Sequence, residues 1–315
     1  MSDNKHGLPI KIDLPEGFLE EETRNDYVIS TKYKELWAVE LDLLATVDAV
    51  CKKYSIPYYA CAGTMLGAVR HHGIIPWDDD IDIMLLRKDY EELCKHADEF
   101  EEPYFFQTGF NDKGNMRGHV QLRNSNTTAI LEFDAPGKYS FNQGVFIDIF
   151  PLDNLPDDSV ERNNYIKKLK KEKNNYMRVR DIPTHIGMAQ SSVKRAAKWI
   201  ISPALKFCDK NFDLSHKLYI NYEENLLKYD KTKTKQVGIL TLAELGDRFN
   251  WDRSDFEGEV EYVPFEFLSI PLPKGYLNML VKSYGEWNKP VKVGTNHGGI
   301  IFDCRIPYKE YMQRL

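Results

Sequence analysis

The spacing of apolar positions predicts an alternation of helices and strands. Between residues 31 and 54, apolar side chains recur every three or four positions among charged ones, which indicates an amphipathic helix. The runs at 58–62 and 80–85 favour short strands, and the segment between them favours a helix over Thr64–His71. A helix is also expected at 88–100, and strands at 104–107, 119–123, 127–133 and 145–150. We expect Pro151 to end the last strand.

After Pro156 the sequence pattern changes from one that favours strands to one that favours helices. Helical patterns fill the stretch from about 157 to 230. Extended segments are expected at 237–240 and 262–270, followed by a helix over 276–284 that Gly285 closes.

These elements predict an α+β fold. An N-terminal arm (1–30) precedes a single domain (31–315) that contains a helical insertion near 157–230. We find no internal repeat that would favour a different organisation.

Composition narrows the class of protein. The chain has 315 residues, of which 42% are hydrophobic and 29% charged, values typical of a globular protein and not of a disordered one. The net charge of -6 argues against a nucleic-acid partner. Five cysteines without CxxC spacing indicate a reducing compartment, and the polar start of the chain predicts no signal peptide. We therefore expect a cytoplasmic protein.

One segment departs from this acidic balance. Residues 161–210 hold 13 Lys and Arg against 4 Asp and Glu. This pattern is consistent with a solvated helical face, or with a surface for an anionic glycan or for anionic lipid headgroups. The second alternative would place the protein peripherally at the inner face of the cytoplasmic membrane.

Three aspartates predict a site for a divalent metal ion. Asp80 and Asp82 alternate with isoleucines on one predicted strand, so their side chains are expected on one face. Asp148 has the same setting between two isoleucines on a later strand. Such mutually repelling acids are typical of a site for Mg²⁺ or Mn²⁺, and three of them can support phosphoryl displacement.

Polar residues near this strand add to the prediction. Gly63 and Thr64 lie at a strand end before a helix, where exposed N–H groups can bind a phosphate. Arg70 follows within two turns and could supply positive charge. Asp78 and Asp79, in contrast, are interpreted as loop or capping residues.

The segment AGTMLGAVRHHGIIPWDDDIDI, residues 62–83, closely resembles the signature of the LicD family, which includes the fukutin and fukutin-related protein domains. The resemblance is strong over about 30–150 and again near 260–300. It implies a nucleotidyltransferase-like fold of the polymerase β superfamily, with a mixed β-sheet flanked by helices. It also implies transfer of a phospho-alcohol from a CDP-alcohol donor to a sugar hydroxyl of a glycan. Family acceptors include teichoic acid, lipopolysaccharide and lipid-linked precursors.

The resemblance assigns the site residues by position. Asp80, Asp82 and Asp148 resemble the metal-binding acids, and Gly63 and Thr64 the phosphate-facing turn. We expect the remaining contacts to phosphate or substrate from Arg70, Trp77, Lys289 and His297. Trp77 is a candidate for an aromatic box around the quaternary ammonium of phosphocholine, whereas a ribitol or glycerol group would need polar side chains.

Two other functions stay open from the sequence. A nucleotidyltransferase that moves NMP to a sugar phosphate or a protein would share the three acids and attack a different phosphorus. An inactive glycan-binding scaffold would have the same fold but would catalyse no transfer. Retention of three repelling carboxylates argues against the scaffold.

Overall fold

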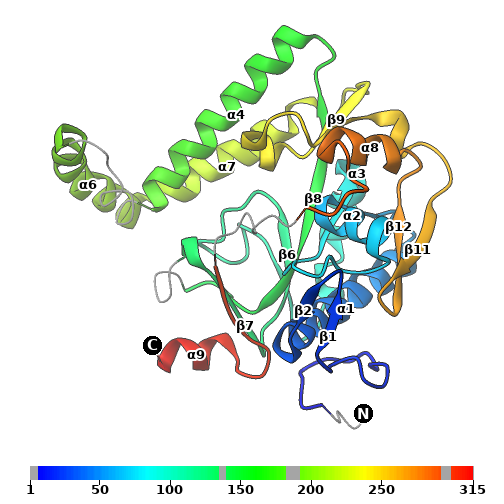
Figure 1. Cartoon of the computed structure of the whole chain (residues 1–315). Coiled ribbons are helices and arrows are strands. Elements are labelled where there is room, and N and C mark those ends of the chain that lie inside the picture. The colour runs from blue at the N-terminus through cyan, green and yellow to red at the C-terminus, as the bar shows by residue number, and fades with distance from the viewer. Residues whose placement is uncertain (1–5, 135–139, 182–191, 292–298, 315) are drawn as a thin grey trace. The chain divides into compact units, whose positions relative to one another are not determined.

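The computed structural model describes residues 6–134, 140–181, 192–291 and 299–314 (Figure 1). The chain folds into two compact units. The first contains residues 1–152 and 251–315, and the second contains residues 153–250. The single domain over 31–315 stays a prediction, and the predicted helical insertion at 157–230 falls within the second unit.

A mixed β-sheet forms the centre of the first unit. Its strands follow the order β3-β4-β8-β6-β5, and the bounds are β3 (Tyr59–Ala60), β4 (Asp82–Leu86), β8 (Val145–Leu155), β6 (Val120–Asn124) and β5 (Tyr104–Gln107). The β4–β8 ladder is parallel, and the other pairs within this unit are antiparallel. Every residue of β6 is buried, as expected for a strand covered on both faces. The predicted α+β class is confirmed.

Helices supply the remaining core of this unit. Leu36, Leu41 and Val47 lie on the buried side of α1 (Thr31–Tyr54) and are fully shielded from solvent. The other helices are α2 (Ala62–His71), α3 (Arg87–Lys95), α8 (Tyr276–Tyr284) and α9 (Tyr308–Arg314), with single turns η1 (Ala97–Glu99), η2 (Glu132–Asp134) and η5 (Arg253–Phe256). Gly285 ends α8 with a φ of 63°, as the sequence predicts.

The predicted end of β8 at Pro151 is wrong. The N–H of Asp148 donates to the carbonyl of Ile81 at 3.0 Å, toward β4. Successive N–H groups of a strand point to opposite edges, so the nitrogen of Pro151 faces the edge away from β4. On that edge the pairing with β6 does not extend past Ile149. The missing N–H therefore interrupts no ladder, and the strand continues to Leu155.

Three two-stranded sheets complete the first unit. The arm contains the hairpin β1 (Glu22–Arg24) and β2 (Tyr27–Ile29). The single extended segment predicted at 262–270 is instead a hairpin of β11 (Glu261–Phe265) and β12 (Leu268–Leu272), which turns at Glu266. The third sheet pairs β7 (Thr128–Leu131) with β13 (Ile300–Asp303).

The second unit is built on two long helices that lie side by side, α4 (Ser159–Arg180) and α7 (Leu214–Leu226) (Figure 1). The hydroxyl of Tyr165 donates to the carbonyls of Asn225 and Leu226, at 2.8 and 3.0 Å, and joins the two helices. The unit also contains α6 (Ser192–Phe212), η3 (Leu227–Tyr229), η4 (Leu240–Leu245) and β9 (Gln236–Gly238), and β10 (Asn250–Asp252) begins at its end.

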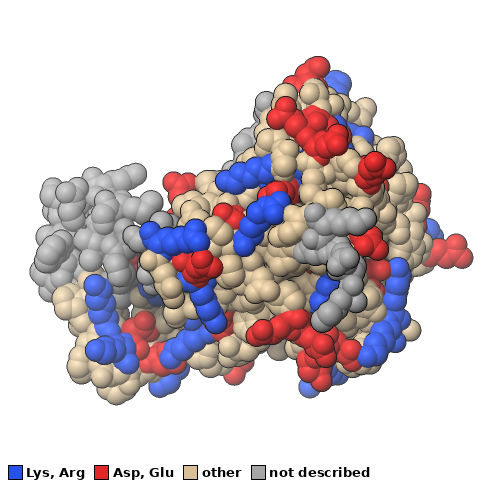
Figure 2. Space-filling model, turned by 90° about the horizontal axis from the view of Figure 1, so that it is seen from below, with Lys and Arg blue, Asp and Glu red and all other residues tan. Residues whose placement is uncertain are grey.

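Two lysines of the second unit lie close to acidic side chains. Lys173 of α4 forms an ion pair with Glu244 at 2.6 Å, and Lys168 lies 3.7 Å from Glu172. Figure 2 shows both signs of charge interspersed on the face that it draws. Within the described residues, none of the helices combines the length and the apolar character that a membrane span requires.

Candidate active site

Asp82 and Asp148 meet at the centre of the sheet. They are direct Cα partners in the parallel β4–β8 ladder, so their side chains leave the same face. Across β8, Asp148 is the partner of Gln121, and Gln121 is in turn the partner of Gln107 on β5. Four adjacent strands thus carry one row of polar side chains on this face.

Asp148 is held in place by two neighbours on or beside β6. Its Oδ1 accepts a hydrogen bond from Nε2 of Gln121 at 2.7 Å and lies 3.2 Å from Nε2 of His119. Burial acts to raise the pKa of Asp148, but the charge and hydrogen bond of His119, the charge of Arg117 and the Gln121 hydrogen bond outweigh it. The net result is a lowered pKa, which keeps this carboxylate ionised.

Asp82 is shifted in the opposite direction. Burial, followed by the charges of Asp80, Asp148 and Asp78, raises the pKa of Asp82 well above its ordinary value. Repulsion among these acids opposes full ionisation of the group. A divalent cation would relieve this repulsion, so the donor set fits Mg²⁺ or Mn²⁺, which prefer carboxylate oxygen.

A buried arginine on the same face holds the polar row in place. Arg123, only 1% exposed, donates to Oε1 of Gln107 at 2.5 Å, to Oε1 of Gln121 at 2.6 Å and to the Gly144 carbonyl at 2.6 Å. Burial, with a contribution from Arg117, lowers the pKa of Arg123 to about 9. Because Oε1 of Gln121 accepts a hydrogen bond from Arg123, Nε2 of Gln121 is the atom that points toward Asp148.

The start of α2 holds Asp82 through Thr64. The Thr64 hydroxyl accepts the Asp82 N–H at 2.8 Å. Gly63 makes room for a neighbouring carboxylate, because a Cβ at this position would lie 2.7 Å from Oδ2 of Asp78. Both residues lie in the first turn of α2, beyond the strand, and their contact with phosphate stays a prediction.

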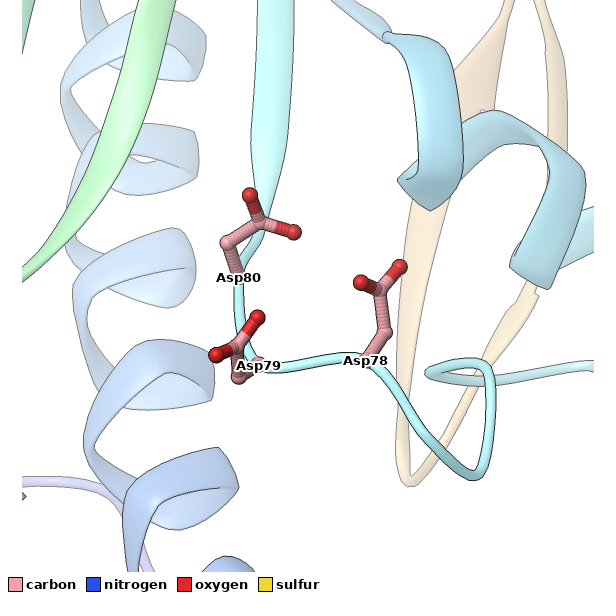
Figure 3. Close-up of side chains that lie close together, drawn as sticks. All are labelled: Asp78, Asp79 and Asp80. Atoms are coloured by element: carbon pink, nitrogen blue, oxygen red, sulfur yellow. The ribbon is translucent and has the colours of Figure 1, made fainter. Parts of the chain in front are cut away.

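Asp78 and Asp79 were expected to be loop or capping residues, and they do lie in a loop. Their carboxylates nevertheless gather with that of Asp80 (Figure 3), with oxygens of all three within 4.8 Å of one another. The structure therefore adds two acids beside the predicted site. The assignment of Asp80, Asp82 and Asp148 as metal ligands stays a prediction.

Arg70 lies at the other end of α2 among aromatic rings. Its Nε donates to Nε2 of His71, and its Nη1 donates to the carbonyl of Trp287, both at 2.9 Å. Trp77 makes edge-to-face contacts at 6.1 Å with the rings of His71 and Tyr27. These residues form a partly exposed cationic and aromatic surface, and its contact with substrate stays a prediction.

The predicted substrate contacts of Lys289 and His297 stay predictions. Lys289 is exposed and pairs with Glu286 three residues earlier at 2.5 Å, a contact of small energetic value. His297 lies outside the described residues.

Sequence reasoning missed the residues that orient Asp148. His119, Gln121 and Arg123 alternate with the apolar Val120 and Leu122, a pattern that places all three polar side chains on one face. That alternation was a usable signal for a polar face, although it did not identify the strand that would lie beside it.

One family model matches the part of the chain that contains these acids. Residues 55–186 match the family model described as the LicD/FKTN/FKRP nucleotidyltransferase domain. Residues 55–186 are thus similar to a LicD-family domain. The resemblance predicted from the segment at 62–83 is therefore confirmed.

One relative extends the LicD likeness beyond this domain. The chain is 28% identical to the lipopolysaccharide cholinephosphotransferase LicD of Haemophilus influenzae over 262 residues, which cover 81% of this chain and 91% of that protein. An uncharacterised protein of Rickettsia prowazekii is 42% identical over 60 residues (19% of this chain, 23% of that protein). Another, from Rickettsia typhi, is 37% identical over 76 residues (23% and 22%).

Proposed function

We propose that this protein is a metal-dependent phosphotransferase that moves a phospho-alcohol from a CDP-alcohol to a sugar hydroxyl of a cell-surface glycan or its lipid-linked precursor. Phosphocholine is the first alcohol to test, because the Haemophilus relative is a cholinephosphotransferase that acts on lipopolysaccharide. We further propose a nucleotidyltransferase-like architecture, which the description of the matching family model supports.

The observation that carries this proposal is the pairing of Asp82 with Asp148 on neighbouring strands. The two acids share one face, and Asp148 is fixed by His119 and Gln121. The charge of Asp148 is one of the causes that raise the pKa of Asp82, whereas His119, Arg117 and Gln121 lower the pKa of Asp148. An arrangement of this kind is suited to a cation that grips phosphate oxygens.

Asp80, Asp82 and Asp148 would hold Mg²⁺ or Mn²⁺. When bound, the ion would neutralise charge on the two phosphates of the donor. Thr64 fixes the backbone of Asp82, and Gln121 fixes the side chain of Asp148, so that both carboxylates are preorganised.

In the proposed reaction, the acceptor hydroxyl attacks the distal phosphorus in line. A bond forms between the acceptor oxygen and this phosphorus, and the bond to the bridging oxygen breaks, which releases CMP. Asp82 or Asp148 takes the hydroxyl proton. Arg70, near the C-terminus of α2, would stabilise phosphate oxygens, and Trp77 would contact the alcohol.

A donor screen tests the proposal. The full chain is incubated with CDP-choline, CDP-ribitol, CDP-glycerol or CDP-ethanolamine, with Mg²⁺ or Mn²⁺, and with or without glycan acceptors. The expected result is CMP release that depends on the acceptor, with the phospho-alcohol recovered on the glycan. Release of pyrophosphate from CTP would favour the nucleotidyltransferase instead, and no turnover of any nucleotide would favour the scaffold.

We also propose that the basic stretch 161–210 contacts anionic headgroups. Helix α4 alone carries eight Lys and Arg against two Glu. Sedimentation with phosphatidylserine-containing vesicles should recover more protein than sedimentation with neutral vesicles, and the difference should fall as salt rises. Equal recovery with both vesicle types would remove this proposal.

A further inference from the structure

A polar groove runs between the two long helices of the second unit, α4 and α7, which lie side by side (Figure 1). Its volume is about 310 Å³, and six residues line it: Lys168, Lys171, Glu172, Asn175, Leu218 and Asn221. The four from α4 are spaced by three, one and three residues, so they share one face of that helix. The face that a helix turns toward its neighbour is usually apolar, so a polar lining calls for an explanation.

Glu172 lies in this groove with one carboxylate oxygen unpaired. Its Oε1 accepts hydrogen bonds from Nδ2 of Asn225 at 3.2 Å and, more weakly, from Nδ2 of Asn221 at 3.4 Å. Its Oε2 is buried and has no hydrogen-bond partner among the described residues. A buried carboxylate oxygen without a donor is unfavourable. The side chain as a whole is 16% exposed, so a hydroxyl group in the groove could complete the bonding of this carboxylate.

Amide and ammonium groups stand beside this acid. Asn175 is half-buried, and no other described residue hydrogen-bonds to its side chain. Lys168 is held in place, because its Nζ donates to Oδ1 of Asn225 at 2.5 Å. Lys171, one turn further along α4, is exposed. The groove therefore offers an acceptor that lacks a donor, amides that can both donate and accept, and positive charge at its edge.

This combination favours a sugar over other small ligands. A phosphate group at neutral pH has oxygens that accept hydrogen bonds, and Glu172 would repel them. An apolar ligand would leave the amides and the carboxylate without partners. The hydroxyl groups of a sugar donate as well as accept, and the C–H face of its ring can pack against Leu218. The volume lies at the low end of the range for small-ligand sites, about 300–1,000 Å³, and suits one ring.

We propose that the groove between α4 and α7 binds one sugar unit of an anionic acceptor glycan. Glu172 accepts a hydrogen bond from a sugar hydroxyl, Asn175 and Asn221 bond to neighbouring hydroxyls, and Lys171 attracts the negative charge of the glycan. The inference rests on the proposed function for the role of the glycan as acceptor. The groove belongs to the second unit, whereas Asp82 and Asp148 belong to the first. We therefore expect the groove to act on glycan binding and not on the transfer step.

Calorimetry on the full chain tests the groove without donor or metal. The probes are delipidated lipopolysaccharide oligosaccharide and teichoic acid, and we expect at least one of them to bind. Glu172→Gln and Asn175→Ala should each weaken this binding about 10-fold, the size of one lost hydrogen bond of this kind. Asn174→Ala is the matched control, because Asn174 is the adjacent residue of the same type, is exposed and does not line the groove; it should bind as the unaltered chain does.

A pair of lysine variants separates sugar binding from general attraction to negative charge. Lys167 and Lys171 are both exposed on α4, but only Lys171 lines the groove. Lys171→Ala should weaken oligosaccharide binding, whereas Lys167→Ala should not. Phosphatidylserine vesicles should lose the same amount of binding with either variant. If both variants weaken oligosaccharide binding equally, the glycan is attracted by charge alone and the proposal is overturned.

The proposal is also overturned if neither glycan binds, or if Asn175→Ala binds as tightly as Asn174→Ala. In the transfer reaction, Asn175→Ala should raise the KM for the acceptor and leave kcat unchanged. Transfer with an unchanged KM would reject the groove and leave the proposed function standing. Groove-dependent oligosaccharide binding without release of CMP from any donor would reject the proposed function alone.

Discussion

Asp82 and Asp148 are separated by 65 residues in the chain but stand side by side as partners of one parallel ladder. Their pKa values are shifted in opposite directions, upward for Asp82 and downward for Asp148. The difference arises because His119 and Gln121 bond to Asp148, whereas the strongest charges on Asp82 are those of other acids. A carboxylate pair of this kind is suited to share one cation.

The hydroxyl of Thr64 should matter for the position of Asp82. Thr64→Val removes the acceptor for the Asp82 N–H. An unpaired buried N–H costs about 1–3 kcal/mol, and we expect urea unfolding to show a loss of that size. Thr64→Ser keeps the hydroxyl and should lose much less. Equal stability of the Val and Ser variants would contradict the role of this hydrogen bond.

His119 should tune metal affinity through Asp148. Removing a group that orients a metal ligand typically costs about 10–100-fold in affinity, and we expect that loss in Mn²⁺ binding for His119→Leu. His119→Gln offers an amide nitrogen near the position of Nε2 and should recover part of the affinity. If Leu and Gln at this position bind Mn²⁺ equally well, the orienting role is wrong.

The Arg24–Glu266 ion pair should stabilise the loop that leads to the acids. Glu266 accepts two hydrogen bonds from Arg24, at 2.6 and 2.9 Å, and one from the Ile74 N–H at 3.0 Å. Its side chain is only 4% exposed, so Glu266→Ala should destabilise the chain by about 3 kcal/mol in denaturant unfolding. A double-mutant cycle with Arg24→Ala should show coupling between the two residues, and additive losses would refute it.

His71 should make the protein sensitive to mild acid. Burial, followed by the charges of Arg70, Arg24 and His72, lowers the pKa of His71 from 6.5 to about 4. The folded state thus binds fewer protons than the unfolded state between these values, so stability from this group is present above pH 6.5 and is lost as pH falls toward 4. Thermal unfolding across this window should show a smaller decline for His71→Gln than for the unaltered chain. Parallel declines would be inconsistent with the shift.

The sequence predicts the elements of this fold better than their contacts. Local periodicity gives α1 and β5 closely, because each depends on its own residues. The error at Pro151 arose because the tolerance of a strand for proline depends on which edge is paired, and pairing is a property of the sheet.

In the candidate site, too, the sequence predicts the residues better than the contacts between them. The chain order marks Asp82 and Asp148 as acids on strands, but only the β4–β8 register makes them neighbours. The bonds of His119 and Gln121 to Asp148 depend on the antiparallel β6–β8 register, which no local pattern specifies.

We propose that phospho-alcohol transfer depends on the Asp82–Asp148 pair. The most direct measurement is the rate of CMP release from the active CDP-alcohol by Asp148→Asn, with Asp98→Asn, an exposed aspartate outside the site, as the control. We predict a loss of more than about 100-fold for Asp148→Asn with folding retained, and an unchanged rate for Asp98→Asn. A folded Asp148→Asn variant that turns over at the rate of the unaltered chain would contradict the account.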